Sequence, residues 1–336
     1  MYHNSSLRSS PYAVIDLHLH LDGSLSLASA KQLAAMQNIS IPETDAEILN
    51  LLQVSPDCKD LNEYLEKFAF PCSLLQTKEA LCTAVYTLCE ELQAQGLLYA
   101  EIRFAPQLHI EKGLTQAEVT AAAIAGMHKS SFHANLILCC MRGDDNHAEN
   151  IETIRTARAY LGKGVCATDL AGAEALFPTA DFADVFALTA ELGVPFTLHA
   201  GEAAGADSVS KALTFGAGRI GHGVRSIEDP AVLQILAKTG IALELCPTSN
   251  LHTNMFRTLA EYPLRSLLDA GVKLTLNTDN MSVSHTTLAA EYQQIADTFD
   301  LTEAELKQFA LNAAEAAFAD EETKVWLRQT MQKRFQ

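Results

Sequence analysis

The fold and the candidate site both begin at one apolar stretch near the N-terminus. It reads Ala13-Val14-Ile15-Asp16-Leu17-His18-Leu19-His20-Leu21-Asp22-Gly23. Its β-branched and apolar residues predict a buried strand that leads into a loop. Residues two apart on a strand face the same side, so His18 and His20 project together. Such a pair can hold one metal ion or can be two hydrogen-bonded interior groups, and the pair alone does not decide between these readings.

Short apolar runs of this kind recur along the chain, and segments of helical periodicity separate most of them. The runs cover residues 13–18, 98–104, 135–140, 164–169, 195–200, 219–222, 241–245 and 273–277. The helical segments include residues 116–132, 150–161, 181–192, 208–215, 230–238 and 262–270. This alternation indicates parallel strands joined by crossovers, and its eight units predict an α/β fold, a (β/α)8 TIM barrel. A doubly wound open sheet is the alternative. No Gly-x-Gly-x-x-Gly follows the first strand, which counts against a dinucleotide-binding fold.

The longest insertion, residues 24–96, follows the first strand. Within it, a capping residue and an apolar helical face are formed by Asp60, Leu61, Tyr64, Leu65 and Phe68. Their spacing alone favours a helix packed on the core. Because an insertion after the first strand emerges on the catalytic rim of a barrel, the segment can also be a lid. Two further helices are expected over 302–319 and 323–335, and residues 1–336 are expected to form one domain.

Composition and charge narrow the class of partner. The chain has 24 basic and 41 acidic residues and a formal net charge of −17, which argues against nucleic acid or an anionic membrane surface. Its eight scattered cysteines contain no Cys-x-x-Cys and are expected to be buried thiols. Residues 1–11 lack the apolar segment of a signal peptide, and no apolar run is long enough to span a membrane. We therefore expect a cytoplasmic protein. The sequence leaves its oligomeric state open.

The C-terminal ends of the predicted strands carry several side chains that can bind a metal ion or transfer a proton. They carry His18, His20, His199, Glu202, His222, Asp279 and Asn280. Three imidazoles and one carboxylate suit zinc, and a catalytic site leaves a position open for water. Taken singly, His222 or Asp279-Asn280 could lie in a plain turn, and Glu202 could sit beside a helix N-terminus. Their joint position at strand ends favours a metal site. Because the fourth strand ends without lysine, a single metal ion is expected.

These residues resemble the adenosine deaminase family of the amidohydrolase superfamily. The motifs that carry the resemblance are Asp16-Leu17-His18-Leu19-His20-Leu21-Asp22-Gly23-Ser24, Asp169-Leu170-Ala171-Gly172, His199-Ala200-Gly201-Glu202, Gly221-His222-Gly223, Cys246-Pro247-Thr248-Ser249-Asn250 and Asn277-Thr278-Asp279. They extend over nearly the whole chain. The resemblance implies a zinc-dependent (β/α)8 hydrolase that removes the 6-amino group of a purine nucleoside.

The resemblance also implies roles for individual residues. One zinc ion per chain would be held by His18, His20, His199 and Asp279. Glu202 would protonate purine N1, while His222 and Asp279 would orient the hydroxide that attacks C6. The substrate would further contact His20, Asp22 (at the ribose 5′-hydroxyl), Gly172 (backbone N–H to N3), Asn280 (at N7) and the apolar lid of Leu61, Tyr64, Leu65 and Phe68.

Two positions depart from the family pattern, and several substrates stay open. Asn280 stands where a second aspartate is common, and its amide can donate to N7 at any pH. Ala173 stands where an acidic residue often follows the glycine. Rival substrates are adenine, aminodeoxyfutalosine or a methylated nucleotide. Asp22 favours a nucleoside because its charge would repel a 5′-phosphate. An amide or lactone hydrolase and a non-catalytic binding protein are disfavoured by the presence of Glu202 and of every expected ligand.

Overall fold

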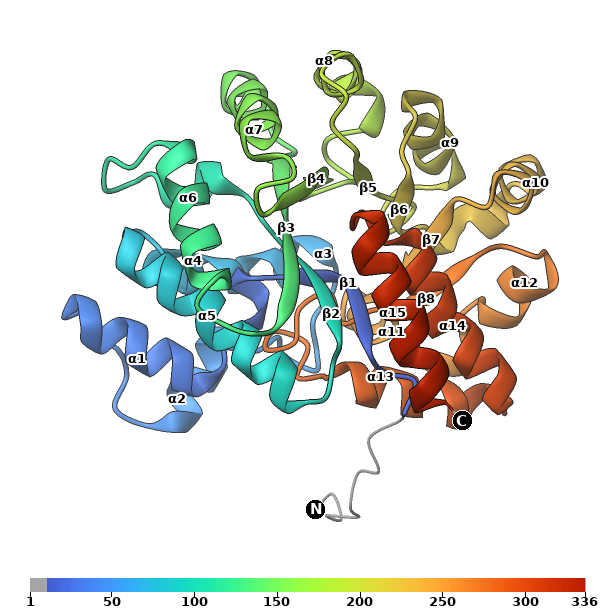
Figure 1. Ribbon diagram of the computed structural model, residues 1–336, viewed down its shortest axis with the longest axis horizontal. Helices are drawn as coiled ribbons and strands as arrows, with labels where there is room; N and C mark the ends of the chain where they lie inside the picture. The colour runs from blue at the N-terminus through green and yellow to red at the C-terminus, as the bar shows by residue number, and fades with distance from the viewer. Residues whose placement is uncertain (1–10, 336) are drawn as a thin grey trace.

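Parallel strands form the centre of the computed structural model, which describes residues 11–335 (Figure 1). The strands are β1 (Ile15–His20), β2 (Tyr99–Phe104), β3 (His133–Met141), β4 (Val165–Ala171), β5 (Thr197–Ala200), β6 (Arg219–His222), β7 (Ala242–Leu245) and β8 (Leu274–Leu276). Two four-stranded sheets have the orders β1-β2-β3-β4 and β5-β6-β7-β8. Single bridges, Thr168 with Phe196 and Leu19 with Asp279, join their edges. The chain is therefore a (β/α)8 barrel, as its alternating pattern predicts.

Helices cover the outside of the strands and fill the insertion. The α-helices are α1 (Leu27–Gln37), α2 (Asp45–Leu52), α3 (Leu61–Leu65), α4 (Ala69–Leu74), α5 (Lys78–Ala94), α6 (Gln116–Met127), α7 (His147–Tyr160), α8 (Ala183–Glu191), α9 (Ala206–Phe215), α10 (Pro230–Thr239), α11 (Pro247–His252), α12 (Leu264–Asp269), α13 (Leu288–Phe299), α14 (Glu303–Ala316) and α15 (Glu321–Arg334). The 3-10 turns are η1 (Asp22–Ser24), η2 (Glu66–Phe68), η3 (Pro106–His109), η4 (Thr179–Phe182), η5 (Val224–Glu228) and η6 (Leu259–Glu261).

Most element boundaries differ from the sequence-based ones by a few residues. The first strand was predicted two residues too early: it extends to His20, which pairs with Arg103 of β2 and whose N–H donates to Asp279 O at 2.7 Å. The helix predicted over 116–132 ends at Met127, and the one predicted over 181–192 is divided between η4 and α8. The expected absence of a signal peptide concerns residues that lie mostly outside the described range, since only Pro11 of that stretch is described.

One end of the barrel is closed by the C-terminal helices. In Figure 1, α14 and α15 lie in front of the strands. Ala310, Leu327 and Met331 of these helices belong to one buried cluster with Val14 and Ile15 at the start of β1. The strand starts are thus covered. No described helix between residues 11 and 335 combines the length and the hydropathy that crossing a membrane requires.

The barrel interior contains charged side chains that no solvent reaches. Arg103 Nη1 lies 3.0 Å from Asp169 Oδ2, and Arg103 Nη2 lies 2.9 Å from Glu244 Oε2. Arg219 pairs with the same Glu244 through Nε at 2.5 Å and with Glu101 through Nη2 at 2.6 Å. All five side chains are at most 1% exposed. Each buried charge therefore has an opposite charge and a hydrogen bond, which burial requires.

The insertion contributes both to the outer ring and to the rim. Its last helix, α5, packs against α6, and a Cβ on Gly126 would lie 2.2 Å from the carbonyl oxygen of Cys82. Glycine is therefore required at that crossing. The segment predicted from Asp60 onward forms α3 and then η2, and the Asp60 side chain accepts a hydrogen bond from Glu63 N, as an N-cap does. This segment lies at the end of the barrel that the C-terminal helices leave open.

Candidate metal and substrate site

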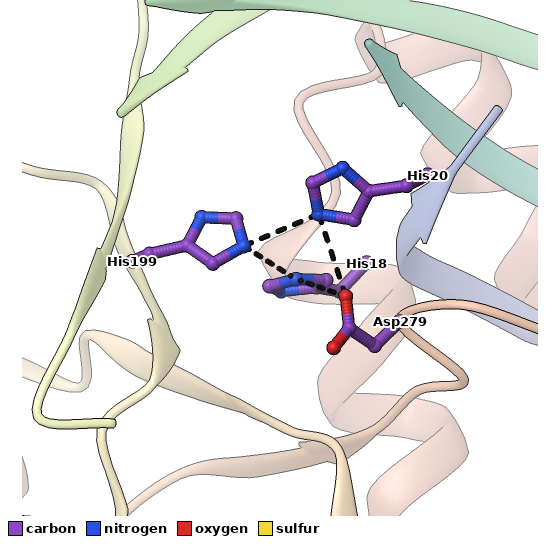
Figure 2. A group of neighbouring side chains, drawn as sticks. All are labelled: His18, His20, His199 and Asp279. Atoms are coloured by element: carbon purple, nitrogen blue, oxygen red, sulfur yellow. Dashed lines mark hydrogen bonds and ion pairs between the residues drawn. The ribbon is translucent and has the colours of Figure 1, made fainter. Parts of the chain in front are cut away.

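Three imidazoles and one carboxylate converge at the C-terminal ends of the strands. His18 and His20 come from β1, His199 comes from β5, and Asp279 follows β8. Figure 2 shows their ring nitrogens and carboxylate oxygen pointing toward one another. The Nε2 atom of His199 lies 3.1 Å from that of His18 and 3.2 Å from that of His20. Asp279 Oδ1 is 3.4 Å from both His18 Nε2 and His20 Nε2. These donor atoms could hold one metal ion.

Two buried carboxylates fix which ring nitrogens face the cluster. Glu244 Oε2 lies 2.8 Å from Nδ1 of His18, and Asp169 Oδ2 lies 2.9 Å from Nδ1 of His199. A carboxylate beside Nδ1 favours the tautomer with its proton there, which leaves the Nε2 lone pair free. Two lone pairs at 3.1 Å have no hydrogen to share, so a cation between them would satisfy both.

Two residues of the site, Asp279 and His222, have a left-handed backbone. Asp279 has φ +61° and His222 has φ +57°, both in the left-handed region that side-chain-bearing residues rarely adopt. Each such residue costs about 1–3 kcal/mol and persists where the surroundings impose it. Here the barrel seam imposes it on Asp279, whose N–H donates to His18 O at 2.7 Å. The surrounding strands thus set the geometry of the site at the cost of this backbone strain.

A cavity of about 290 Å³ opens above the cluster. Among the residues that line it are His20, Asp22, Leu61, Tyr64, Leu65, Phe68, Gly172, His199, Glu202, His222, Asp279 and Asn280. These are the residues singled out in the sequence, and the fold brings all of them to one space. His18 is not part of the lining and is fully buried.

Glu202 and His222 face each other across the cavity wall. Their Oε2 and Nε2 atoms are 3.6 Å apart, and both side chains are almost wholly buried. Burial, together with the negative charges of Asp279 and Glu174, raises the pKa of Glu202 well above its ordinary value. Burial lowers the pKa of His222 well below its ordinary value. Burial therefore favours the protonated carboxylic acid at Glu202 and the neutral imidazole at His222.

The tautomer of His222 follows from a second hydrogen-bond chain. The hydroxyl of Tyr262 donates to Asn250 Oδ1 at 3.2 Å, which leaves the Asn250 amide nitrogen, at 3.1 Å, to donate to Nδ1 of His222. The proton of neutral His222 then sits on Nε2, toward Glu202 and the cavity. This contact accounts for the Asn250 that ends one of the sequence motifs.

Asp22 and Asn280 occupy the cavity wall near η1. Burial raises the pKa of Asp22 to about 6, and its carboxylate accepts the N–H of Gly23 at 3.1 Å. The thiol of Cys72 lies 3.6 Å from Asp22 Oδ2. A Cβ on Gly23 would come within 1.8 Å of Asn280 Oδ1, so glycine at this position makes room for the Asn280 side chain.

The segment from Leu61 to Phe68 covers the cavity. Leu61 and Tyr64 form a small apolar cluster with Val283 of the loop after β8, and Phe68 and Ala203 pack against it. The Tyr64 hydroxyl is 2.7 Å from Ser284 Oγ, so a hydrogen bond joins the segment to that loop. Its apolar face thus packs on the loop after β8, as expected of a helix packed on the core, and the same residues line the cavity.

Some residues around the site were not assigned roles from the sequence. Asp169 begins one of the family motifs, whereas Glu244, Arg103 and Glu174 belong to none of them. Glu174 follows Ala173, which lines the cavity, and its carboxylate is buried. A charged residue inside an apolar strand, such as Glu244 in Ala242–Leu245, was the available signal, because burial of a charge requires a partner.

Fold and cluster together define the class: a (β/α)8 barrel with a candidate metal centre at its strand ends. The sequence model of the adenosine deaminase family matches residues 13–334, and the chain belongs to that family.

Individual relatives agree with this assignment. An adenosine deaminase from Haemophilus ducreyi is 51% identical over 333 residues, covering 96% of this chain and 97% of that protein. One from Enterococcus faecalis is 40% identical over 326 residues, covering 96% of each. The crystal structure of an adenine deaminase from Arthrobacter aurescens superposes with a TM-score of 0.85 at 26% identity, covering 96% of this chain and 98% of that one.

Proposed function

We propose that the chain hydrolyses the 6-amino group of adenosine and 2′-deoxyadenosine, giving inosine or 2′-deoxyinosine and ammonia, with one zinc ion. One observation carries the proposal: Glu202 is buried, which raises the pKa of its carboxyl, and it lines the same cavity as the histidine–aspartate cluster. A carboxylic acid beside a purine ring is what the reaction needs, because attack at C6 places negative charge on N1. Membership of the adenosine deaminase family supports the choice of purine.

The proposed zinc ligands are His18, His20, His199 and Asp279. Their free Nε2 lone pairs and one carboxylate oxygen are the donor set that zinc takes in proteins. A second group, in which His222 and Cys246 replace His20 and His199, shares His18 and Asp279 with the first, so the two groups favour one ion per chain. Bound zinc would lower the pKa of a water molecule and make it a nucleophile at neutral pH.

Side chains of the cavity would carry the protons. Glu202 would donate its proton to N1 while the attacking oxygen bonds to C6, so the ring stays neutral as it loses aromaticity. His222, with its proton on Nε2, and Asp279 would orient that oxygen. The attacking water brings two protons: one would return Glu202 to its acid form, and the other would leave C6 with the amino group as ammonia, so that the 6-oxo product remains. The deep burial of Glu202 suits the role because a solvated carboxyl would be ionised at neutral pH.

Other lining residues would hold the nucleoside in place. The backbone N–H of Gly172 would meet N3, the carboxylate of Asp22 would accept the ribose 5′-hydroxyl, and the Asn280 amide would donate to N7. His20 would border the ring beside the metal. Leu61, Tyr64, Leu65 and Phe68 would form the lid that excludes bulk water. In this proposal residues 1–336 are one hydrolase domain and residues 24–96 contain its lid.

Adenine or a larger adenosine derivative such as aminodeoxyfutalosine is the alternative substrate, and the similarity to the Arthrobacter aurescens adenine deaminase favours considering it. Asp22 supports the nucleoside, because it offers an acceptor to a hydroxyl and would repel a phosphate. Ammonia release measured in parallel on adenosine, 2′-deoxyadenosine, adenine, AMP and aminodeoxyfutalosine tests the choice. We expect the highest kcat/KM for the two nucleosides, and a preference for adenine or AMP would contradict the proposal.

A further inference from the structure

The Glu174 carboxylate accepts hydrogen bonds from four consecutive backbone N–H groups. Its Oε2 accepts the N–H groups of Glu202, Ala203 and Ala204 at 3.0, 2.7 and 2.9 Å, and its Oε1 accepts that of Gly201 at 2.8 Å. The Ser208 hydroxyl also donates to Oε1. The Glu174 side chain is about 1% exposed. Because every partner is an N–H or O–H donor, the carboxylate form satisfies all of them at once.

The turn held in this way carries Glu202. Arg225 supports its carbonyl groups, because its backbone N–H donates to Gly201 O at 3.1 Å and its Nη1 donates to Ala203 O at 3.2 Å. Residues 201–205 belong to no helix or strand, and α9 begins only at Ala206, with no side-chain cap at Gly205. Gly201 has φ +69°, and a Cβ there would lie 2.5 Å from Val209 Cγ2. The backbone therefore makes a sharp left-handed turn between β5 and α9. Four unpaired N–H groups in a buried turn would be costly, and Glu174 pairs all four.

Two neighbouring loops anchor Glu174 itself. The Ser208 hydroxyl is 2.7 Å from Thr179 Oγ1, and Thr179 accepts from Arg142 Nη2 at 3.0 Å. The same Nη2 donates to the carbonyl of His199 at 2.7 Å. Loops after β3, β4 and β5 are thus joined in one buried network around the turn. A displacement of Glu174 would be transmitted to Glu202 and not absorbed by solvent.

The charges around Glu202 act in addition to the hydrogen bonds that hold its turn. The ionisable groups that act on Glu202 come from four places: Glu174 after β4, Arg142 after β3, His222 at the end of β6, and Asp279 after β8. Glu174 and Asp279 favour the protonated form of Glu202, and Arg142 favours the ionised form. Glu174 is the negative group among them that lies outside the proposed metal ligands, so it can be changed without changing those ligands.

We propose that Glu174 is the positioning residue of the general acid: its hydrogen bonds fix the 201–204 turn so that the Glu202 carboxyl faces the ring. The inference rests on the proposed function. It assigns no contact between Glu174 and the substrate.

The test compares Glu174→Gln, Glu174→Asp and a matched control, Glu191→Gln, which makes the same change at an exposed position of α8. Each variant is checked for thermal stability and zinc content before kinetics. Misplacement of a reacting group by about 1 Å can reduce the rate about 100-fold. We expect Glu174→Gln to lose about that factor in kcat with little change in KM. We also expect the alkaline limb of its pH–kcat profile to move to lower pH, because the variant lacks the negative charge beside Glu202. In Glu174→Asp, which keeps the negative charge, this limb should stay at the pH of the wild type.

Hydrogen exchange gives a readout that does not depend on turnover. In Glu174→Gln, the amides of residues 201–204 should exchange faster than in the wild type, while the amides of β7 should exchange at the wild-type rate. In the Glu191→Gln control, the amides of residues 201–204 should also exchange at the wild-type rate. An unchanged rate and pH profile in a folded Glu174→Gln overturns the positioning role alone. Absence of ammonia release from wild-type enzyme overturns the proposed function and this role together. A loss of activity that only follows the folded fraction shows a purely structural contact and also overturns the inference.

Discussion

Glu244 Oε2 lies 2.8 Å from Nδ1 of His18, on the side of the imidazole opposite the Nε2 atom that joins the cluster. The same carboxylate pairs with Arg103 and Arg219, so one buried glutamate connects a candidate metal ligand to two buried cations. Positive charge from the two arginines holds the pKa of Glu244 well below its ordinary value despite burial. The orientation of His18 is thus set from inside the barrel, whether or not a metal is bound.

Replacement of Glu244 by Gln should weaken metal binding without touching a ligand. Loss of a carboxylate behind a ligating histidine typically lowers metal affinity about 10- to 100-fold. Stability should also fall, by about 3–5 kcal/mol, because two buried cations lose a partner. Chelator competition measures the first effect and denaturant unfolding the second. Glu315→Gln, in the exposed pair with Lys273, should change neither. Unaltered zinc affinity in Glu244→Gln would refute this support of His18.

Metal content is the most direct check of the cluster. We expect about one zinc ion per chain by elemental analysis, and loss of activity on chelation with recovery on addition of zinc. His18→Ala should remove both zinc and activity, because it deletes a ligand from the centre of the group. Two metal ions per chain, or full activity after chelation, would contradict the site as drawn.

The raised pKa of Glu202 gives the activity a direction with pH. The acid works only while protonated, so kcat/KM should hold below its pKa and fall as pH rises through it. Glu202→Gln should keep zinc and fold yet lose about 10²- to 10⁴-fold in kcat. Whatever rate remains should lack that alkaline limb. A variant with near wild-type turnover would show that another group protonates N1.

Asn280 can be tested against the atom it is proposed to meet. Replacing N7 by carbon, in 7-deazaadenosine, should lose the about 1–3 kcal/mol of an unmade hydrogen bond, or roughly 5- to 150-fold in kcat/KM. Asn280→Leu should lose a similar factor on adenosine and little more on the deaza compound, since both changes remove one contact. Asn280→Asp should retain activity but lose it as the carboxyl ionises. Losses that simply multiply would mean that Asn280 does not contact N7.

The tyrosine of the lid offers a milder perturbation. Tyr64→Phe removes the hydroxyl that meets Ser284 Oγ and keeps the apolar face over the cavity. One hydrogen bond is worth about 0.5–1.5 kcal/mol net. We expect KM for adenosine to rise by a few fold with kcat little changed, measured in steady state. A fall in kcat alone, with KM unchanged, would argue that the hydroxyl acts in the reaction and not in covering the cavity.

The barrel and the residues lining its cavity were accessible from sequence because both follow local rules. Strand–helix alternation sets the topology, and catalytic side chains gather at strand ends, so His199 and Asp279 could be paired with His18 without a structure. The buried supports were not accessible in this way. Glu244 is 226 residues from His18, and nothing near it in the chain indicates which histidine it will meet. Glu174 pairs with backbone amides, which carry no signature in the sequence. The end of β1 was missed because its last pairings, of Leu19 with Asp279 and of His20 with Arg103 of β2, come from distant parts of the chain.

The seam between β1 and the residues after β8 has a consequence for the order of events during folding. His18 and His20 lie on its first side and His199 belongs to the second sheet, while Asp279 closes the seam through its own backbone. A nascent chain or a half-barrel therefore cannot offer all four of the proposed ligands. An ion that needs all four donors binds only the closed barrel and stabilises it by mass action. Zinc uptake would then report that the last strand has docked, and metal starvation would leave the barrel easiest to open at this seam.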